Sequence, residues 1–365
     1  MESSYSYTSG SFYDFSNYSN LPSGLLYTHT DHVIISIVNP CILALGLIGN
    51  IAFLFVMASV RRMWTVTNMY LINMAVADIL FLTVAVSVKL ANYIGSPVII
   101  DQSTVGHVGS VTTSLLLDLS YFASLFLVTL VSLEKFYAVC HPLRHRLIGG
   151  MKRTTKLIIG VWLLALMVAL VLLPTRMENQ KFFVEWPQDQ EFQNFPDMIE
   201  VEQPIVTWYV EFHNIVQTVP FFVALTLNVV FYVKIIMRLS QKVSTVSTES
   251  SAQELRRLKI RNQVALMLIV NGVAFFVCLA PFQLLSFILT ISQRSGASLS
   301  AEHFNNAQWV GRILTYINPV LNPFIYNLTN PRYRAAFHEA FTCKGKRHQS
   351  EESKTTNDNT VGSML

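Results

Sequence analysis

The sequence predicts an all-α fold: a bundle of seven transmembrane helices followed by a short amphipathic helix on the inner leaflet. Hydrophobic residues make up 52% of the chain, charged residues 13%, and the mean hydropathy is +0.42, which is too apolar for an ordinary soluble domain. Seven apolar stretches are long enough to cross a hydrocarbon core of about 30 Å as helices. They cover residues 32–60, 67–94, 105–138, 154–174, 204–239, 262–291 and 304–328.

The distribution of Lys and Arg predicts the orientation of these spans. Of the 26 basic residues, 21 lie in the segments 61–66, 135–156, 234–261 and 331–365. The positive-inside rule places these segments in the cytoplasm. We therefore expect a multi-pass protein of the plasma membrane with an extracellular amino terminus. The polar start of the chain shows no cleavable signal peptide, so the first span is expected to direct insertion.

The chain divides into four parts. Residues 1–31 are rich in Ser, Tyr, Asn and Gly and are expected to be an extracellular disordered tail. They form either a solvated leader or an aromatic arm that helps to capture a peptide. Residues 32–330 form the seven-helix domain, 331–343 the amphipathic helix, and 344–365 a cytoplasmic disordered tail. Asn17 begins a glycosylation sequon on the outer side.

Polar side chains inside the spans are candidates for function. Asn50 and Asp78 lie at mid-span, where a polar group is costly unless it faces the bundle and finds partners. Hydrogen bonding between helices is the competing explanation. For Asp78 we favour a hydrated cluster that holds a sodium ion through oxygen ligands. Pro281, Pro319 and Pro323 each delete a backbone hydrogen bond and predict kinks that act as hinges.

Glu134 and Lys135 stand side by side where the third apolar run ends. They are either a simple interfacial anchor or a polar switch at the mouth of the bundle.

The carboxyl-terminal segment begins with apolar residues at 333, 336 or 337, 340 and 341, the spacing of a helix that lies on a membrane. Cys343 closes it as a palmitoylation candidate. The tail beyond carries clustered hydroxyls that are candidates for phosphorylation. It ends in Ser363-Met364-Leu365, which fits a PDZ groove. No cysteine is placed to form an extracellular disulfide.

Several motifs occur in order on the expected helices: Gly49-Asn50, Leu71 to Asp78, Glu134 to Pro142, Trp162, Pro220, Cys278 to Pro281, and Asn322 to Tyr326. With these motifs, residues 32–343 resemble the rhodopsin-like (class A) G-protein-coupled receptors, most closely the neuropeptide and chemoattractant receptors. The resemblance implies that the outer half binds a ligand and that the inner half opens to admit a heterotrimeric G protein. Arrestin and membrane lipid are the other partners that it implies.

The resemblance also assigns residues to roles. It maps the allosteric sodium site onto Asp78, Ser124, Asn318 and Asn322. It maps the activation switch and G-protein coupling onto Glu134, Lys135, Phe275, Leu279, Pro281, Pro323 and Tyr326. Within this switch we expect Glu134 to restrain Lys135 until the sixth helix moves.

Five positions depart from the family pattern. Lys135 stands where arginine is usual and lacks the planar guanidinium fork. Arg261 lies near a position that is often acidic, so an inactive-state ionic lock is not expected there. Leu279 replaces a tryptophan, Asn228 a tyrosine, and Ser110 the cysteine that ties the third helix to the second outer loop. These departures motivate an alternative: an atypical or decoy receptor with weak G-protein coupling.

The ligand is inferred from the outer half. The seventh span has no lysine for retinal, and Leu117 occupies the position where amine receptors carry aspartate. Loop 175–203 interleaves seven acids with five aromatic residues, which predicts an acidic rim that attracts a cation and apolar anchors for a bound chain. A basic or amphipathic peptide is therefore the first choice, and a lipid or other small molecule is the alternative.

The candidate ligand-binding residues are Leu117, Asp118, Tyr121, Glu185, Trp186, Glu211, Phe282, Gln283, Arg312 and Tyr316. An ion pair from Arg312 to Asp118 or Glu211 that only holds the bundle together is the competing explanation for those charges. The chain lacks hydrolase and metalloprotease motifs and repeated halves. We therefore expect neither an enzyme nor a transporter, no nucleic-acid partner, and no cofactor beyond the sodium ion.

Overall fold

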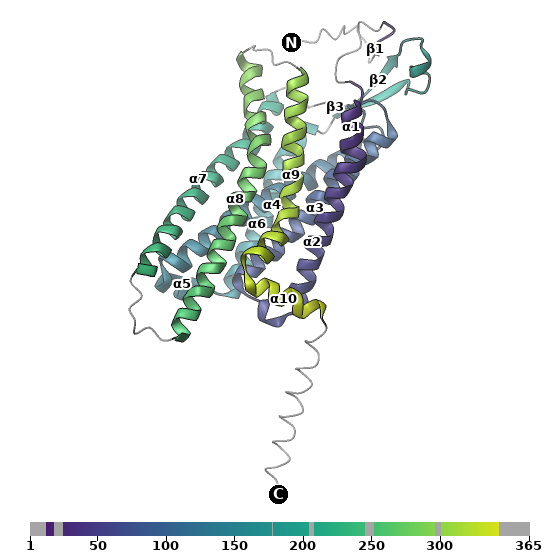
Figure 1. The fold of residues 1–365 in the computed structure, drawn as a ribbon. Coiled ribbons are helices and arrows are strands. Elements are labelled where there is room, and N and C mark those ends of the chain that lie inside the picture. The colour runs from purple at the N-terminus through teal and green to yellow at the C-terminus, as the bar shows by residue number, and fades with distance from the viewer. Residues whose placement is uncertain are drawn as a thin grey trace.

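The computed structural model describes residues 12–17, 25–176, 178–203, 208–244, 252–295 and 301–342. Its long helices lie side by side in one bundle (Figure 1). The first span runs from α1 (His29–Val33) through a π-helical stretch (Ile34–Val38) into α2 (Asn39–Ser59). The other long helices are α3 (Val66–Gly95), α4 (Gly106–Cys140), α6 (Met151–Leu172), α7 (Trp208–Ser244), α8 (Ala252–Ser295) and α9 (Ala301–Thr329). The predicted seven-helix bundle is confirmed.

Six of these helical spans, within the residues described, are long and apolar enough to cross a membrane. They are His29–Ser59, Val66–Gly95, Gly106–Cys140, Met151–Leu172, Trp208–Gln241 and Lys259–Ser292. The seventh helix, α9, packs against α2 and α8. Polar residues that include Arg312, Asn318, Asn322 and Asn327 interrupt its apolar sequence. The helix is therefore less apolar than the others because it carries much of the bundle's interior polarity.

Some helix boundaries differ from those predicted, and the structure adds short helical elements. Helix α8 begins at Ala252 rather than at residue 262, because the intervening Glu, Leu, Arg and Lys residues favour helix and extend it beyond the apolar part. A helix that was not predicted, α5 (Pro142–Ile148), follows α4. Helix α10 (Pro331–Phe341) starts after Asn330, whose side chain accepts a hydrogen bond from the Arg332 backbone at 3.0 Å. Three 3₁₀ turns cover Arg61–Met63, Leu173–Arg176 and Gln190–Phe192.

A three-stranded sheet caps one end of the bundle, and the all-α prediction did not include it. Strand β2 (Glu178–Glu185) pairs in parallel with β1 (Phe12–Asp14) and antiparallel with β3 (Met198–Gln203). We call this end the sheet end, and the opposite end, which carries α5 and α10, the α10 end (Figure 1). The expectation of a disordered tail is corrected for β1 and for the first residues of α1.

The sheet has an apolar core of its own. Its buried members come from three separate segments: Phe15, Leu25, Val98, Phe182, Val184, Trp186, Phe192 and Ile199. Backbone hydrogen bonds join the same segments, from Phe15 to Glu185 at 2.8 Å and from Ile99 to Leu25 at 2.9 Å. We call β1, β2, β3 and residues 25–28 and 96–105 the sheet module. Hydrophobic burial drives its assembly, and the cysteines of the described chain are free thiols.

The proline kinks of α9 are satisfied from outside the helix. Pro323 has no N–H, so the carbonyl of Pro319, four residues earlier, loses its helical donor. The side-chain amide of Asn50 on α2 donates to that carbonyl at 3.0 Å and to Gly46 O at 2.9 Å. A Cβ at Gly49 would lie 3.3 Å from Cγ of Pro323, so glycine permits this close approach of α2 and α9. Asn50 therefore explains how a membrane helix tolerates the kink.

Candidate functional site

A cavity of about 250 Å³ lies between the helices toward the sheet end. Seven of the ten predicted ligand-binding residues line it together: Leu117, Asp118, Tyr121, Phe282, Gln283, Arg312 and Tyr316. The Tyr121 hydroxyl donates to the carbonyl of Gln217 at 3.2 Å and accepts from the amide of Gln283 at 2.9 Å. Helices α4, α7 and α8 are therefore tied at the floor of this cavity by one phenol.

A second cavity of about 430 Å³ adjoins the first on the side of the sheet module. Leu117, Arg312 and Tyr316 line both cavities, and Lys89 lines the second. The sequence interpretation missed Lys89, although a lysine inside an apolar span is itself a signal of a functional position. Between the helices and the module there is thus a continuous polar space.

Lys89 and Arg312 meet around one indole ring. The Lys89 ammonium lies 5.9 Å from the Trp309 ring centroid and 5.2 Å from that of Tyr27, and the Arg312 guanidinium carbon lies 5.7 Å from the Trp309 ring centroid. All three distances are typical of cation–π contacts. Arg312 and Asp118 line the first cavity together. Two adjacent cations therefore line the second cavity.

Asp31 fixes this aromatic group in place. One carboxylate oxygen accepts from Trp309 Nε1 at 2.6 Å, and the other accepts from the Thr28 backbone and hydroxyl at 2.7 Å. The second set is the capping box that begins α1. Burial, together with the nearby Asp31 carboxylate, raises the pKa of Tyr27 to about 12. Asp31 thus joins the start of α1 to α9 beside the cavity.

Three predicted ligand-binding residues are not brought to these cavities. Glu185 is exposed on β2, Glu211 lies in the first turn of α7, and Trp186 is buried in the sheet module. Trp186 Nε1 donates to the Pro196 carbonyl at 2.9 Å. The expectation that the loop aromatics anchor a ligand is wrong for those in the module core, because the loop uses them to build that core. Of this set, Phe183 is exposed.

Ser110, which stands in place of the family cysteine, is buried and donates a hydrogen bond to the carboxylate of Glu202 on β3. The tie between α4 and the second loop is therefore present in a noncovalent form. The sequence identified Ser110 as a departure but gave no indication of Glu202 as its partner.

The predicted sodium-site residues gather at mid-bundle. Asp78, Ser124, Asn318 and Asn322 are all buried, and the Asn322 amide donates to the Asp78 carboxylate at 2.7 Å. The side-chain oxygens of Asn318 and Asn322 are buried without a hydrogen-bond partner within the described chain. Unpaired buried oxygens beside a carboxylate match the ligand set of a hard cation. The residues present therefore fit a sodium ion.

Five of the seven predicted switch residues are buried: Glu134, Phe275, Leu279, Pro323 and Tyr326. Leu279 lines the first cavity and is buried, as is Phe275 one turn away. Pro281 lies inside α8, and Pro323 lies inside α9. The Tyr326 ring packs 5.2 Å from Phe53 and 5.8 Å from Tyr333 on α10 (centroid distances). Burial raises the pKa of Tyr333.

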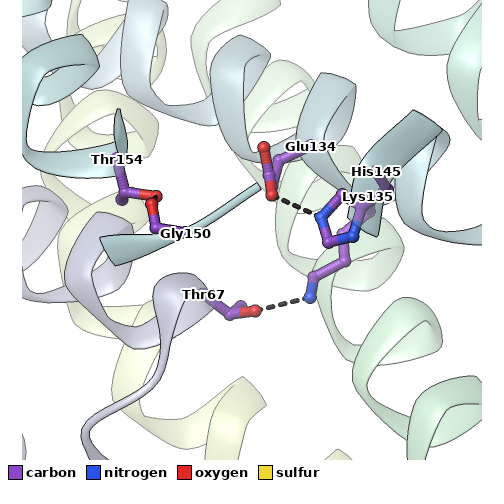
Figure 2. A network of polar contacts seen from close by, with 6 residues as sticks. All are labelled: Thr67, Glu134, Lys135, His145, Gly150 and Thr154. Carbon is purple, nitrogen blue, oxygen red and sulfur yellow. Dashed lines mark hydrogen bonds and ion pairs between the residues drawn. The ribbon is translucent and has the colours of Figure 1, made fainter. Parts of the chain in front are cut away.

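Glu134 and Lys135 turn away from each other. In Figure 2, Glu134 points toward His145 of α5 and Lys135 toward Thr67 of α3. His145 Nε2 lies 2.6 Å from Glu134 Oε1, and the Lys135 ammonium donates to the Thr67 hydroxyl. Glu134 and Lys135 therefore hydrogen-bond to different partners, and the restraint of Lys135 by Glu134 stays a prediction. Consecutive residues on a helix point about 100° apart and do not face each other.

The structure describes only one of the predicted modification sites. Asn17 is exposed beyond β1, and its glycosylation stays a prediction. Cys343 and the terminal residues 363–365 lie outside the described residues.

The bundle, its polar mid-section and the cavity at one end together define a membrane receptor with seven helices. Residues 49–326 match the 7 transmembrane receptor (rhodopsin family), and the chain belongs to this family. It is accordingly a receptor rather than an enzyme and a multi-pass membrane protein.

The chain is similar to several peptide receptors. It is 29% identical to mouse (Mus musculus) neuromedin-U receptor 2 over 315 residues, which cover 83% of this chain and 74% of the relative. It is 25% identical to mouse somatostatin receptor type 2 over 342 residues, covering 90% and 84%. It is 26% identical to human (Homo sapiens) neuropeptide FF receptor 1 over 338 residues, covering 89% and 74%.

Proposed function

We propose that the chain binds an extracellular peptide at the sheet end and signals through heterotrimeric G proteins at the α10 end. The names of the similar receptors supply the ligand class: neuromedin U, somatostatin and neuropeptide FF. The bias of Lys and Arg toward the α10 end supports a cytoplasmic placement of that end, with 21 of 26 basic residues in its segments. The amino terminus and the sheet module are then extracellular.

The observation that carries this proposal is the charge arrangement of the cavities. Glu185, Asp189 and Glu191 are exposed on loop 175–203, whereas Lys89 and Arg312 line the second cavity together. A ligand with a basic group and a carboxylate matches both charges, the first on the loop and the second in the cavity. This arrangement supports an amphipathic peptide rather than a purely basic one.

The test is a peptide screen read by second messengers and arrestin recruitment together, followed by substitutions in the receptor. For an activating peptide with a free carboxylate, Arg312→Gln should weaken potency at least tenfold, because a buried charge loses its partner. Lys181→Gln, on the exposed surface of β2, is the matched control. An equal loss of potency in Arg312→Gln and Lys181→Gln would favour a lipid or other neutral ligand. Potency that does not change with salt concentration would favour the same alternative.

We also propose that Asp78, Ser124, Asn318 and Asn322 hold a sodium ion. The ion would neutralise the carboxylate and coordinate the two asparagine oxygens that lack partners. Replacing choline chloride with sodium chloride at constant ionic strength should raise the Tm of the purified receptor, and Asp78→Asn should abolish the difference. A sodium effect that persists in Asp78→Asn would locate the ion elsewhere.

A second candidate function, an atypical receptor with weak coupling, is favoured by one observation. Lys135 offers a single ammonium group, which is already hydrogen-bonded to Thr67, where an arginine would present a fork of donors. G-protein turnover in wild type and Lys135→Arg separates the two functions. Robust wild-type turnover excludes the decoy, whereas a gain only in the variant supports it. Arrestin and PDZ partners stay predictions.

A further inference from the structure

A third cavity, of about 280 Å³, lies at the α10 end. Its lining includes Thr67 of α3, Lys135 of α4, Arg261 of α8, and Arg332 and Tyr333 of α10. Three of these five residues are cationic. The cavity is thus placed where α4 and α8 approach the helix that follows the bundle.

Among the described residues, the lining of this cavity is positively charged. No carboxylate is among the described residues that line it. The nearest acid in sequence, Glu134, is bound to His145, and Glu339 of α10 pairs with Arg62 at 2.7 Å. Like charges that share a small space raise the free energy of the closed arrangement unless an anion joins them.

Arg261 shows the imbalance most directly. Its Nε and Nη2 atoms are buried and have no hydrogen-bond partner in the part of the chain that the structure covers. Donor nitrogens that leave water without gaining acceptors are costly. Two adjacent donors in one plane are the geometry that binds a phosphate through two oxygens. The Lys135 ammonium and Thr67 hydroxyl supply further donors from the opposite side of the cavity.

We propose that this cavity binds a phosphate monoester that bridges Lys135 on α4 to Arg261 on α8. The anion takes the place of the missing acid and holds the two helices together at the α10 end. Removing it leaves two cations facing the same space, which favours separation of α8 from α4. The phosphate is therefore an external lock that lowers basal signalling, a consequence that rests on the proposed function.

The α10 end is the proposed cytoplasmic end, where two sources present this chemistry. One is the headgroup of an inner-leaflet phosphoinositide, and the other is a soluble inositol phosphate. Arg332, which is exposed at the cavity edge, is placed to contact either as it enters. The shared feature is a phosphate ester with at least two negative charges.

Binding is tested on the full chain in phosphatidylcholine nanodiscs, with no agonist and no G protein, so a failure of the proposed coupling does not affect the result. One arm adds soluble inositol trisphosphate, and the other includes phosphatidylinositol bisphosphate in the disc. Wild type should show saturable binding in at least one arm and a higher Tm with the anion. The arm that responds identifies the source.

Three variants test whether the anion binds in the cavity beside Arg261. Arg261→Gln should weaken binding at least tenfold, whereas Lys152→Gln, an equal charge change at an exposed position of the same end, should not. Arg261→Glu should bind no anion yet keep a high Tm, because the new carboxylate pairs with Lys135. Equal weakening in Arg261→Gln and Lys152→Gln would show that the anion is attracted to the surface without a specific site, and would overturn the proposal. The proposal would also be overturned if Arg261→Gln bound the anion as tightly as wild type does.

Discussion

Replacing Trp186 tests whether the sheet module is held by its own apolar core. The indole is 7% exposed, packs against Phe15, Phe192 and Phe195, and donates to the Pro196 carbonyl. Trp→Ala in a packed core costs about 3–5 kcal/mol. Because the module lies beyond the bundle and water can enter the space, we expect about 3 kcal/mol. That value corresponds to a roughly 100-fold rise in the population of the locally opened module.

Amide hydrogen exchange on the full-length protein measures this opening directly. In Trp186→Ala, exchange should speed up in β1, β2 and β3 together, while mid-bundle amides of α3 and α4 keep their protection. Phe183→Ala is the matched control, since this side chain lies on the same strand and is 59% exposed. Equal exchange in the two variants, or loss of protection throughout the bundle, would refute an independent core.

Three further predictions concern single polar groups. Asn50→Leu should destabilise the bundle by about 1–3 kcal/mol, because a carbonyl of α9 loses its donor. Thermal unfolding should show little change in Asn327→Leu, whose amide bonds within its own helix. Ser110→Ala should accelerate exchange in β3 about tenfold by releasing Glu202, and unchanged exchange would show that the contact holds nothing. The burial of Tyr27 stabilises the fold below its ordinary pKa of 10, and this contribution is lost as pH rises toward the folded pKa of about 12. Spectrophotometric titration of wild type and of Tyr27→Phe should differ by one phenol that titrates with that pKa.

The bundle and most of the cavity could be predicted from the sequence because both depend on helical periodicity. Leu117, Asp118 and Tyr121 line one cavity since they lie within about one turn of α4. The contact between Asp78 and Asn322 likewise follows from two polar groups at similar depth in neighbouring spans, where each needs a partner.

The errors occur where periodicity gives no information. The interleaved acids and aromatic residues of loop 175–203 were interpreted as a ligand surface, yet Trp186 faces inward. Strand pairing with β1, a segment more than 150 residues earlier in the chain, determines which side of β2 is buried. The partner of Glu134 was also hidden, because it required the position of α5, a helix too short and too polar to be expected.

The replacement of a cysteine at Ser110 changes how the sheet module is coupled to the bundle. A disulfide would hold the second loop against α4 whatever the state of the module. Here the same tie is a hydrogen bond from Ser110 to Glu202, and it is retained only while the core around Trp186 keeps β3 in place. Asp31, through Trp309, connects the beginning of α1 to the ring that the two cavity cations share. Noncovalent contacts therefore connect the module, the amino-terminal helix and the cavity lining. A ligand that displaces any one of these contacts changes the stability of the others.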